Sequence, residues 1–309
     1  SFVRSNWQII NPAAIHRILT LGGNSAKNNP SAMASINYRE QWFRIDNTAR
    51  PRVFHASVEA PFGENIRIGG VVVLDRVGAF STTDALVNCT YRLRIGERNN
   101  INYIDIGINV GLNRQKIANL SDNQNNQPDA IFDQYPNKNA AFSSGLGIMY
   151  RHNQAYYLGF SFPKMMRWNQ KGRDANLLDI AFIAGTYMDY SDYPFLEKLN
   201  AHPIIEPTII LRSTRNQQFY PWGSKKNSPL SIDFNVRTYI WDKIWWGIGY
   251  GTNQNLSAEM AWTKRYEIAT SGSSEATNNY FLGLNLNYPV GKKSIRLGPS
   301  VELTAGVAW

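Results

Sequence analysis

Residues 294–309 decide the fold, and they read SIRLGPSVELTAGVAW. Apolar positions in this stretch alternate with small, polar or charged ones, and the apolar set is Ile295, Leu297, Val301, Leu303, Ala305 and Val307. Strict period-two alternation is typical of a β-strand with one apolar and one polar face. The stretch therefore predicts a strand that separates two environments, either at the edge of a soluble sandwich or in the wall of a membrane barrel.

The stretch ends on the aromatic residue Trp309, with no polar tail. This ending resembles the C-terminal signal of bacterial outer-membrane β-barrels, in which such an aromatic would lie in the interfacial girdle. One strand does not separate a barrel from a sandwich, so the remaining chain has to decide.

Similar alternating segments of about ten residues recur along the whole chain. In one clear case, Ile232 and Phe234 alternate with Asp233. We predict strands at residues 31–44, 52–61, 65–75, 80–96, 101–112, 140–151, 155–163, 177–188, 204–213, 229–240, 244–252, 256–266, 278–289 and 294–309. Segments 177–188 and 204–213 are more uniformly apolar than the rest. A chain of strands alone forms a sandwich, a propeller or a barrel, and the lack of a 40-residue repeat disfavours the propeller.

The polar faces favour the barrel. The polar side of a sandwich meets water and favours Lys and Glu, whereas these positions hold Gly, Ser, Asn, Asp and Arg with almost no Lys. The predicted lumen-facing charges are Glu59, Asp75, Asp84, Asp105, Asp179, Glu206, Asp233, Glu259 and Glu302, with Arg39, Arg67, Arg92, Arg94, Arg212, Arg237 and Arg296. These groups nearly balance, as buried charges require, and the opposite face is almost uncharged, as lipid contact requires. The sequence predicts an all-β transmembrane outer-membrane antiparallel β-barrel of about fourteen strands.

Bulk composition agrees with this fold class. The 309 residues contain 13% aromatic residues, with 9 Trp and 16 Tyr, which is rich for a soluble domain and expected for two aromatic girdles. No run of about eighteen apolar residues exists, so no spanning helix is predicted. The single cysteine, Cys89, excludes an intrachain disulfide. No signal peptide is visible at Ser1, so an exported protein would be in its processed form.

The connections predict an orientation. Segments 113–139, 164–176 and 214–228 are long and polar, and we expect them outside the cell, with the short turns and both termini in the periplasm. Residues 1–29 precede the first strand and are too long for a bare lead-in. We therefore predict two parts, an N-terminal periplasmic or lumen hatch at 1–29 and a transmembrane barrel at 30–309. A simple turn leading into the barrel is the alternative for the motif at Asn11.

Several motifs occur in order along residues 11–252. They are Asn11-Pro12-Ala13, then Tyr38-Arg39-Glu40-Gln41-Trp42, then Gly69-Gly70 with Asp75, Gly78, Phe80 and Ser81, and finally Asp233 and Asn235 with Trp246-Gly247 and Tyr250. Together they resemble the PorP/SprF family, outer-membrane proteins of the type IX secretion and gliding systems of Bacteroidetes. The resemblance fades after Trp262.

The resemblance implies a barrel that holds or displays secreted proteins at the cell surface. The implied partner is a secreted adhesin or enzyme with a type IX C-terminal sorting domain, and some members are linked to periplasmic components of the secretion or gliding machinery. The competing interpretation is an outer-membrane channel, or a carrier for small or apolar ligands. An acyl-transfer enzyme acting on outer-leaflet lipid is a third and remote alternative.

The motif residues are candidates for a lumen site. Asn11 and Pro12 would belong to the hatch. For Tyr38, Arg39, Gln41 and Trp42, two interpretations remain open: a clasp for the hatch or for a partner's tail, and a structural lumen network with one girdle tryptophan. Asp75, Asp233 and Asn235 are further motif residues on predicted lumen faces.

No catalytic, metal or cofactor motif is apparent. The four histidines are His16, His55, His152 and His202. His55 lies on a polar face near Ser57 and Glu59, where a lumen hydrogen bond is a simpler role than catalysis. No metal-type spacing and no phosphate-binding loop occur. We therefore predict neither an enzyme nor a cofactor.

The net charge of +9 has a predicted location. The expected outer-rim cations are Arg44, Arg50, Arg52, Arg76, Arg114, Lys116, Lys138, Lys164, Arg167, Lys171, Arg173, Arg215, Lys225, Lys226, Lys292 and Lys293. Lipopolysaccharide phosphates or an acidic partner domain would explain them. Nucleic acid is excluded as a partner because the charges ring a rim and no recognition helix is apparent.

Exposed aromatics beside the rim cations suggest a partner site. The candidates are Trp168, Lys171, Arg173, Phe219, Tyr220, Trp222, Lys225 and Lys226. Aromatic residues and arginine are enriched at binding hot spots. Girdle anchoring is the alternative, especially for Trp168.

Overall fold

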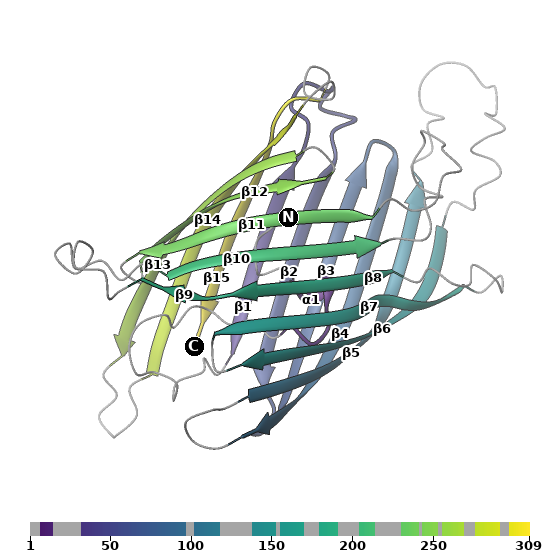
Figure 1. Ribbon diagram of the computed structural model, residues 1–309. Helices are drawn as coiled ribbons and strands as arrows, with labels where there is room; N and C mark the ends of the chain where they lie inside the picture. Colours follow the sequence, from purple (N-terminus) through teal and green to yellow (C-terminus); the bar gives the residue numbers. More distant parts are fainter. Residues whose placement is uncertain are drawn as a thin grey trace, which may run out of the picture.

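The alternating segments form one antiparallel sheet in the computed structural model (Figure 1). The structure describes residues 7–14, 32–96, 102–117, 138–152, 155–169, 179–190, 204–213, 230–240, 243–252, 255–268, 276–290 and 297–309. The elements are α1 (Trp7–Ile10), β1 (Met33–Glu40), β2 (Arg52–Pro61), β3 (Ile66–Val77), β4 (Phe80–Ile95), β5 (Asn102–Ile117), β6 (Lys138–His152), β7 (Tyr156–Asn169), β8 (Ile180–Thr186), β9 (Met188–Asp189), β10 (Ile204–Ser213), β11 (Ser231–Ile240), β12 (Ile244–Gly251), β13 (Asn255–Ile268), β14 (Ala276–Pro289) and β15 (Ser300–Ala308).

The sheet closes on itself. Each strand pairs with its neighbour in the sequence, β15 pairs with β1, and β10 pairs with β11. Both β8 and β9 pair with β10 on the same side and are separated only by Tyr187. They are one interrupted strand, so the fifteen segments make a wall of fourteen strands. The predicted fold class and strand number are confirmed.

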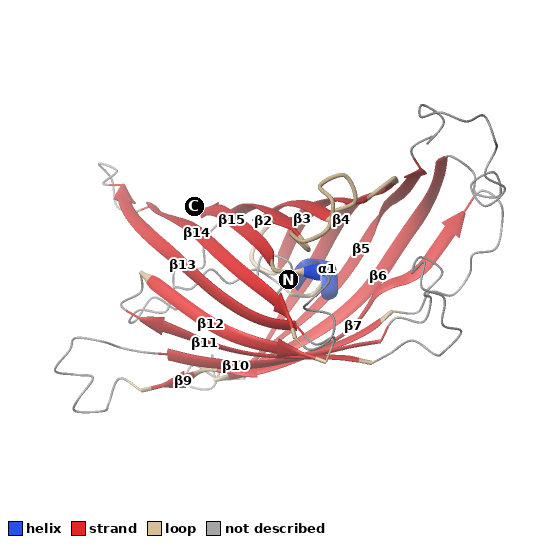
Figure 2. Cartoon of the chain, turned by 90° about the horizontal axis from the view of Figure 1, so that it is seen from above, coloured by secondary structure: helices blue, strands red, loops and turns tan. Residues whose placement is uncertain are grey.

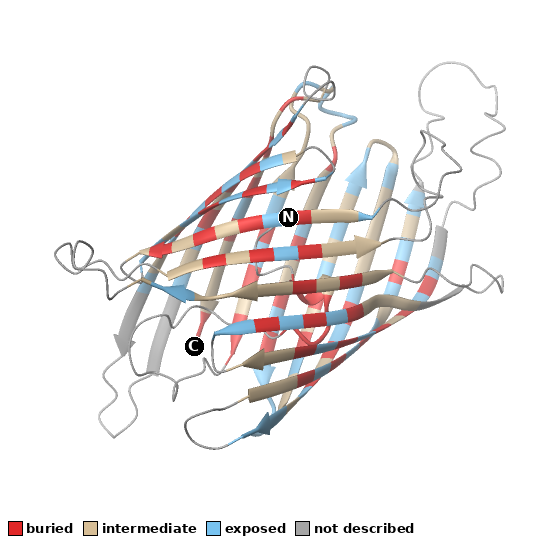
Figure 3. Cartoon of the chain, in the orientation of Figure 1, coloured by how far each residue is buried: buried red, intermediate tan, exposed pale blue. Residues whose placement is uncertain are grey.

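Side chains alternate between the two faces of the wall as predicted (Figure 3). On β15, Glu302 and Thr304 are buried on the inward face, whereas Leu303 between them is 51% exposed on the outward face. A water-soluble protein buries its apolar side chains, so this inverted pattern is that of a wall between a polar lumen and lipid.

Two ends of the barrel are distinguished by their connections. The long-loop end, as we name it, carries the connections at 41–51, 118–137, 170–179, 214–230 and 290–299, with short turns at 78–79 and 252–254. The short-turn end carries those at 62–65, 96–101, 153–155, 241–243 and 269–275, with one long connection at 190–203. Outward aromatics lie near both ends. They are Tyr38, Phe54, Phe142, Tyr250 and Tyr288 at the long-loop end, and Tyr91, Tyr156, Trp246, Trp262 and Tyr280 at the short-turn end. This distribution is that of two interfacial girdles.

Four strand ends differ most from the prediction. β5 continues to Ile117, because Lys116 still pairs with β6 and Ile117 with Phe80 of β4, and β7 continues to Asn169, because its last four residues still pair with β6. β1 ends at Glu40, because the chain turns there and Trp42 adopts a positive φ of 61°. β15 begins only at Ser300, because Pro299 before it has no N–H to donate.

Among the described residues, no helix is long and apolar enough to cross a membrane.

Candidate functional site

Residues 7–14, which comprise α1 and the turn after it, lie inside the barrel against its inner wall (Figure 2). Five side-chain hydrogen bonds join this segment to the wall: Gln8 donates to Glu59, Asn88 donates to Gln8 (3.3 Å), Asn11 donates to the Ile148 carbonyl (3.2 Å), Thr90 donates to the Pro12 carbonyl (3.0 Å), and Ser161 donates to the Ile10 carbonyl (2.7 Å). The bonds reach β2, β4, β6 and β7, so the segment is attached to one continuous arc of the wall.

Three inward glycines allow the turn to approach the wall. A Cβ atom at Gly107 would collide with the Pro12 backbone, and one at Gly147 would collide with the Asn11 side-chain oxygen. At Gly159 it would lie 2.9 Å from Asn11 Nδ2. Only residues without a side chain fit these positions of β5, β6 and β7, so the wall is shaped to the Asn11-Pro12 turn.

An apolar cluster continues this contact surface. Trp7, Ala13 and Ala14 pack with Met149 of β6, Tyr157 of β7, Ile183 of β8 and Ile210 of β10. The rings of Trp7 and Tyr157 lie 5.5 Å apart. We name the inward residues Gly107, Gly147, Gly159, Met149, Tyr157, Ile183 and Ile210 the lumen seat. The seat explains why segment 177–188 is apolar on both faces, since the inward Ile183 packs against the N-terminal segment. On β10 only Ile210 packs in this way, and the inward Glu206 and Thr208 are polar.

Ion pairs cross the remaining lumen surface. They are Glu59–Arg67, Asp105–Arg92 (2.8 Å), Asp105–Arg151 (3.2 Å), Asp84–Lys164 (3.4 Å), Asp233–Arg212 and Glu259–Arg237. Every acid in this set was predicted to face the lumen, and pairing of the predicted acids with the predicted arginines is confirmed at four places. Arg151 was missed, although it lies at an inward position of the alternating pattern. Lys164 is a correction to the predicted outer-rim cations, because it pairs with Asp84 in the lumen from the irregular part of β7 beside the register shift. The lumen charges therefore neutralise one another locally.

Polar side chains on β1, β11 and β13–β15 form local hydrogen-bonded groups. Asn37 donates to Glu302 and Thr304 at 2.6 Å each, and Asn235 donates to Glu259 at 3.3 Å. The Arg237 guanidinium also lies 5.0 Å above the Trp245 ring. We name the inward faces of β11–β15 and β1 the polar half of the lumen.

The motif residues occupy three places. Asn11 and Pro12 lie on the lumen seat. Arg39, Asp75, Asp233 and Asn235 lie on inward faces, and Arg39 is within electrostatic reach of Glu302, Arg212 and Asp75. Tyr38 is a correction to the predicted lumen set, because it is 41% exposed on the outward face, one residue out of phase with Arg39.

Gln41 and Trp42 belong to the rim loop, residues 41–51. The Trp42 amide donates to Ser300 Oγ (3.2 Å), and the amides of Phe43 and Arg44 donate to the carbonyls of Pro299 (3.0 Å) and Leu297 (3.2 Å). With its amide oriented to satisfy both groups, Gln41 Oε1 accepts from Arg39 Nε at 2.7 Å. The motif thus fastens the rim loop to the start of β15, which agrees with the structural interpretation of these residues.

Charged groups stabilise the rim loop from within. Arg50 donates to the carbonyls of Ile45 (2.9 Å) and Phe43 (3.0 Å), and its guanidinium lies 5.3 Å above the Phe43 ring. Thr48 donates from its backbone N–H (3.0 Å) and its hydroxyl (3.2 Å) to Asp46, which lowers the pKa of that carboxyl. The loop is a built part of the rim at the long-loop end.

The predicted partner residues are largely beyond the described part of the chain. Lys171, Arg173, Phe219, Tyr220, Trp222, Lys225 and Lys226 all lie outside the described residues. Trp168 is a correction, because it belongs to β7, opposite Phe142 of β6, and not to a loop. Its strand continues past Pro163 because a register shift at Gly145 restores the pairing.

The histidines form no common site in the described residues. His55 is buried on the inward face of β2, as predicted, and His152 lies 2.6 Å from Asn102 Oδ1 and stacks on Tyr156. His16 and His202 lie outside the described residues. Within the described ranges, no group of His, Cys, Asp and Glu residues could hold a metal ion.

Comparisons with solved structures return membrane and secretion barrels. The chain is similar to a Pseudomonas aeruginosa FadL homologue, with 8% identity and a TM-score of 0.41, over 92% of this chain and 93% of that chain. It is also similar to the translocator domain of the autotransporter NalP from Neisseria meningitidis, with 10% identity and a TM-score of 0.34, over 92% of this chain and 90% of that chain. A third is outer membrane phospholipase A from Escherichia coli, with 11% identity and a TM-score of 0.30, over 97% and 96%.

No curated protein matches the chain. The family model described as "Type IX secretion system membrane protein PorP/SprF" matches residues 25–307, and so extends beyond Trp262, where the motif resemblance fades. The closed wall and its apolar outward face place such a protein in the bacterial outer membrane. The chain belongs to the PorP/SprF family of type IX secretion system membrane proteins.

Proposed function

We propose that this barrel anchors a type IX secreted surface protein, of the adhesin or gliding type, by holding the C-terminal domain of that protein. Family membership carries the proposal, because the family is described as part of the type IX secretion system. The proposal gives the barrel a binding role and no catalytic one.

The contents of the lumen favour an anchor over a conduit. In this proposal residues 1–29 are a hatch and residues 30–309 the barrel. Support comes from the five hydrogen bonds and the apolar cluster that hold residues 7–14 to the wall. Elsewhere in the lumen, acidic side chains pair with arginines, so no permeating ion is needed to neutralise them. A transported solute would have to displace these contacts.

The proposed orientation has the long-loop end outside the cell and both termini in the periplasm. Even strand number puts the two ends of the wall on the same side, and Met33 of β1 does lie opposite Ala308 of β15. Periplasmic secretion or gliding components would then meet the short-turn end, and the secreted partner would meet the long loops.

The proposed partner site lies at the end of β7 and in the two connections after β7 and β10. It comprises Trp168, Lys171, Arg173, Phe219, Tyr220, Trp222, Lys225 and Lys226. Phe219-Tyr220-Pro221-Trp222 begins six residues after β10 ends at Ser213, beyond the expected lipid interface. Truncation of a hot-spot aromatic to alanine weakens the free energy of binding by about 2 kcal/mol or more.

The partner experiment is a double substitution, Tyr220→Ala with Trp222→Ala. We expect the secreted partner to be released into the medium while the barrel assembles at its normal level. The matched control is Tyr250→Ala with Tyr288→Ala, which removes two exposed girdle aromatics at the same end of the barrel. Full retention of the partner by the first variant would move the site to residues 118–137 or to the lumen.

A conductance experiment separates the anchor from a channel or carrier. In planar bilayers, the intact chain should give no steady conductance, whereas deletion of residues 1–29 should raise the leak. Porin-like conductance from the intact chain would refute the plugged barrel and support transport of small solutes instead.

A further inference from the structure

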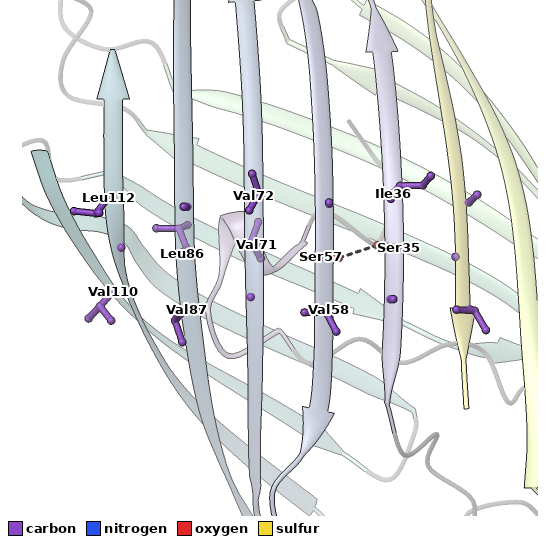
Figure 4. A pocket seen from close by; sticks show the side chains of 18 of the residues that line it. Ser35, Ile36, Ser57, Val58, Val71, Val72, Leu86, Val87, Val110 and Leu112 are labelled. Carbon is purple, nitrogen blue, oxygen red and sulfur yellow. Dashed lines mark hydrogen bonds between the residues drawn. The ribbon is translucent and has the colours of Figure 1, made fainter. Parts of the chain in front are cut away.

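The outward face of β1–β5 contains a hollow that the proposed function does not use (Figure 4). Its volume is about 930 Å³, near the upper end of the range of about 300–1,000 Å³ found for ligand sites. Small outward residues on five neighbouring strands form its floor, and they are Ala34, Ala56, Gly70, Ala85 and Ala305. Larger apolar residues such as Ile36, Val58 and Leu112 border it, so an apolar ligand would be held at the sides.

A row of cations crosses the same strands nearer the long-loop end. Cross-strand pairing places Arg52 opposite Arg76, Arg76 opposite Ser81, and Ser81 opposite Lys116. These four residues all occupy outward-facing positions of their strands. Arg114, the next outward residue of β5 toward the membrane centre, lies opposite Thr83. We name Arg52, Arg76, Arg114 and Lys116 the basic row.

Most of the basic row lacks an acidic partner in the described residues. Arg52 forms an ion pair with Glu40 at 3.4 Å. Among the described ranges, no acid pairs with Arg76, Arg114 or Lys116, each of which is exposed. Like charges placed directly opposite each other on a sheet are destabilising. An anion bound at this row would remove that repulsion.

The distance between the row and the hollow fits an amphipathic ligand. Four residues along β3 separate Arg76 from Val72, which lines the hollow. At about 3.4 Å per residue this is about 13 Å along the strand, or about 10 Å along the membrane normal for a strand tilted by about 40°. A ligand with an anionic head and several acyl chains would reach both parts.

The opposite side of the barrel shows that the basic row is not a general feature of the rim. On β11–β14 the outward residues at the long-loop end include Leu230, Tyr250, Leu256, Tyr288 and Val290, which are all uncharged. Among the residues that the structure describes, the outward cations at the long-loop end therefore lie on the strands that form the hollow. Arginine and lysine are the usual ligands of phosphate groups.

We propose that the hollow and the basic row form a binding site for a phosphorylated, multiply acylated glycolipid of the outer leaflet. The phosphates bind Arg76, Arg114 and Lys116, and the acyl chains fill the hollow over Ala56 and Ala85. The site lies apart from the proposed partner site on the loops after β7 and β10, and its place in the outer leaflet rests on the proposed orientation of the barrel.

The test measures lipid binding to the purified full-length barrel by native mass spectrometry. The probes are bisphosphorylated lipid A, the same lipid without its phosphates, and phosphatidylglycerol. We expect wild type to bind lipid A at least tenfold more tightly than either of the other two. Arg76→Gln with Arg114→Gln and Lys116→Gln should weaken lipid A binding at least tenfold, and Ala56→Leu with Ala85→Leu should weaken it severalfold by filling the hollow.

Two matched controls make the same kinds of substitution at positions outside the basic row and the hollow. Lys264→Gln removes an exposed cation at the short-turn end of β13, and Ala258→Leu enlarges an outward alanine of β13 outside the hollow. Both should bind lipid A as wild type does. Heat-modifiable mobility on gels checks that each variant is folded, and Arg76→Gln alone replaces the triple variant if the latter does not assemble. Equal binding of phosphatidylglycerol and lipid A, or unchanged binding by the basic-row variant, would overturn the proposal.

Discussion

The two sides of the lumen are built from different residues on the same scaffold. The lumen seat on β5–β8 and β10 is glycine and apolar side chains, and it packs against residues 7–14. The polar half on β11–β15 and β1 has Asn, Ser, Thr, Glu and Arg side chains, several of which pair with one another, beside the inward glycines of β12. Both sides keep period-two alternation and an apolar outward face.

This difference shows that the composition of the inward residues of a barrel strand depends on what those residues contact. Where a wall meets its own side chains, polar residues supply hydrogen-bond partners for one another, which buried polar groups need. Where a wall meets another part of the chain, apolar and small residues replace them. Glu206 on β10 joins the two sides, because Tyr157 from the seat and Tyr239 from β11 both donate to it.

The largest expected effect is in the polar half. Arg237→Met should lower the free energy of unfolding by about 3–5 kcal/mol, because the buried Glu259 carboxylate loses its ion-pair partner. Urea unfolding of the barrel in lipid measures the change. Arg237→Met combined with Glu259→Leu should recover most of the loss, since it removes both charges. If the double variant is as unstable as the single one, packing of Arg237 on Trp245, and not its charge, sets the stability.

The next effect tests the face opposite the polar half. Leu284→Arg on β14 should cost about 2–4 kcal/mol if the residue lies near the membrane midplane. The neighbouring Asn285 faces the lumen, so Asn285→Ser is the control on the same strand and should cost less. Membrane yield and heat stability are the measurements. Normal assembly of Leu284→Arg would contradict this register of β14.

A smaller effect should appear at the lumen seat. Gly147→Ala places a Cβ atom against the Asn11 side chain, and overpacking of this kind costs about 1–3 kcal/mol. We expect the N-terminal segment to be displaced, which a cysteine placed at Ala13 would report through faster labelling by a water-soluble reagent. The control is Gly283→Ala in the polar half, where the nearest atom would be 3.3 Å away. Equal labelling of the two variants would mean that the seat does not hold the segment.

The sequence predicted the wall better than its contents. Alternation located all fourteen strands, because a wall between lumen and lipid imposes a period on every residue. It also predicted the inward acids, since a charge on the lipid face would be too costly. The contacts of Gly107 with Pro12 and of Trp7 with Tyr157 were out of reach, because they join residues about 95 and 150 positions apart by no periodic rule. The one sign of the lumen seat in the sequence was that segment 177–188 is apolar on both faces of its strand.

Tyr38 and Trp168 mark the limit of the motif argument. Tyr38 was assigned by motif and is placed on the outward face by strand parity, whereas Trp168 was assigned to a loop and is placed in β7 by its backbone pairing. Parity is a physical constraint on every residue of a strand, whereas a motif records only which residues occur together. Where the two disagree in a barrel, parity decides the face.

The smallest effect tests whether the N-terminal segment can leave the lumen seat without unfolding of the barrel wall. Thr90→Val keeps the shape of the side chain but removes the hydrogen bond to the Pro12 carbonyl, which should cost about 1 kcal/mol. Because that bond joins the N-terminal segment to β4 and not β4 to another strand, the loss should appear as faster labelling of a cysteine at Ala13, with the urea midpoint of the barrel nearly unchanged. Ser35→Ala removes a bond of 2.8 Å to Ser57 between β1 and β2, and should do the reverse. If both variants shift the urea midpoint alike, the N-terminal segment unfolds together with the wall, and the two sides of the lumen are one cooperative unit.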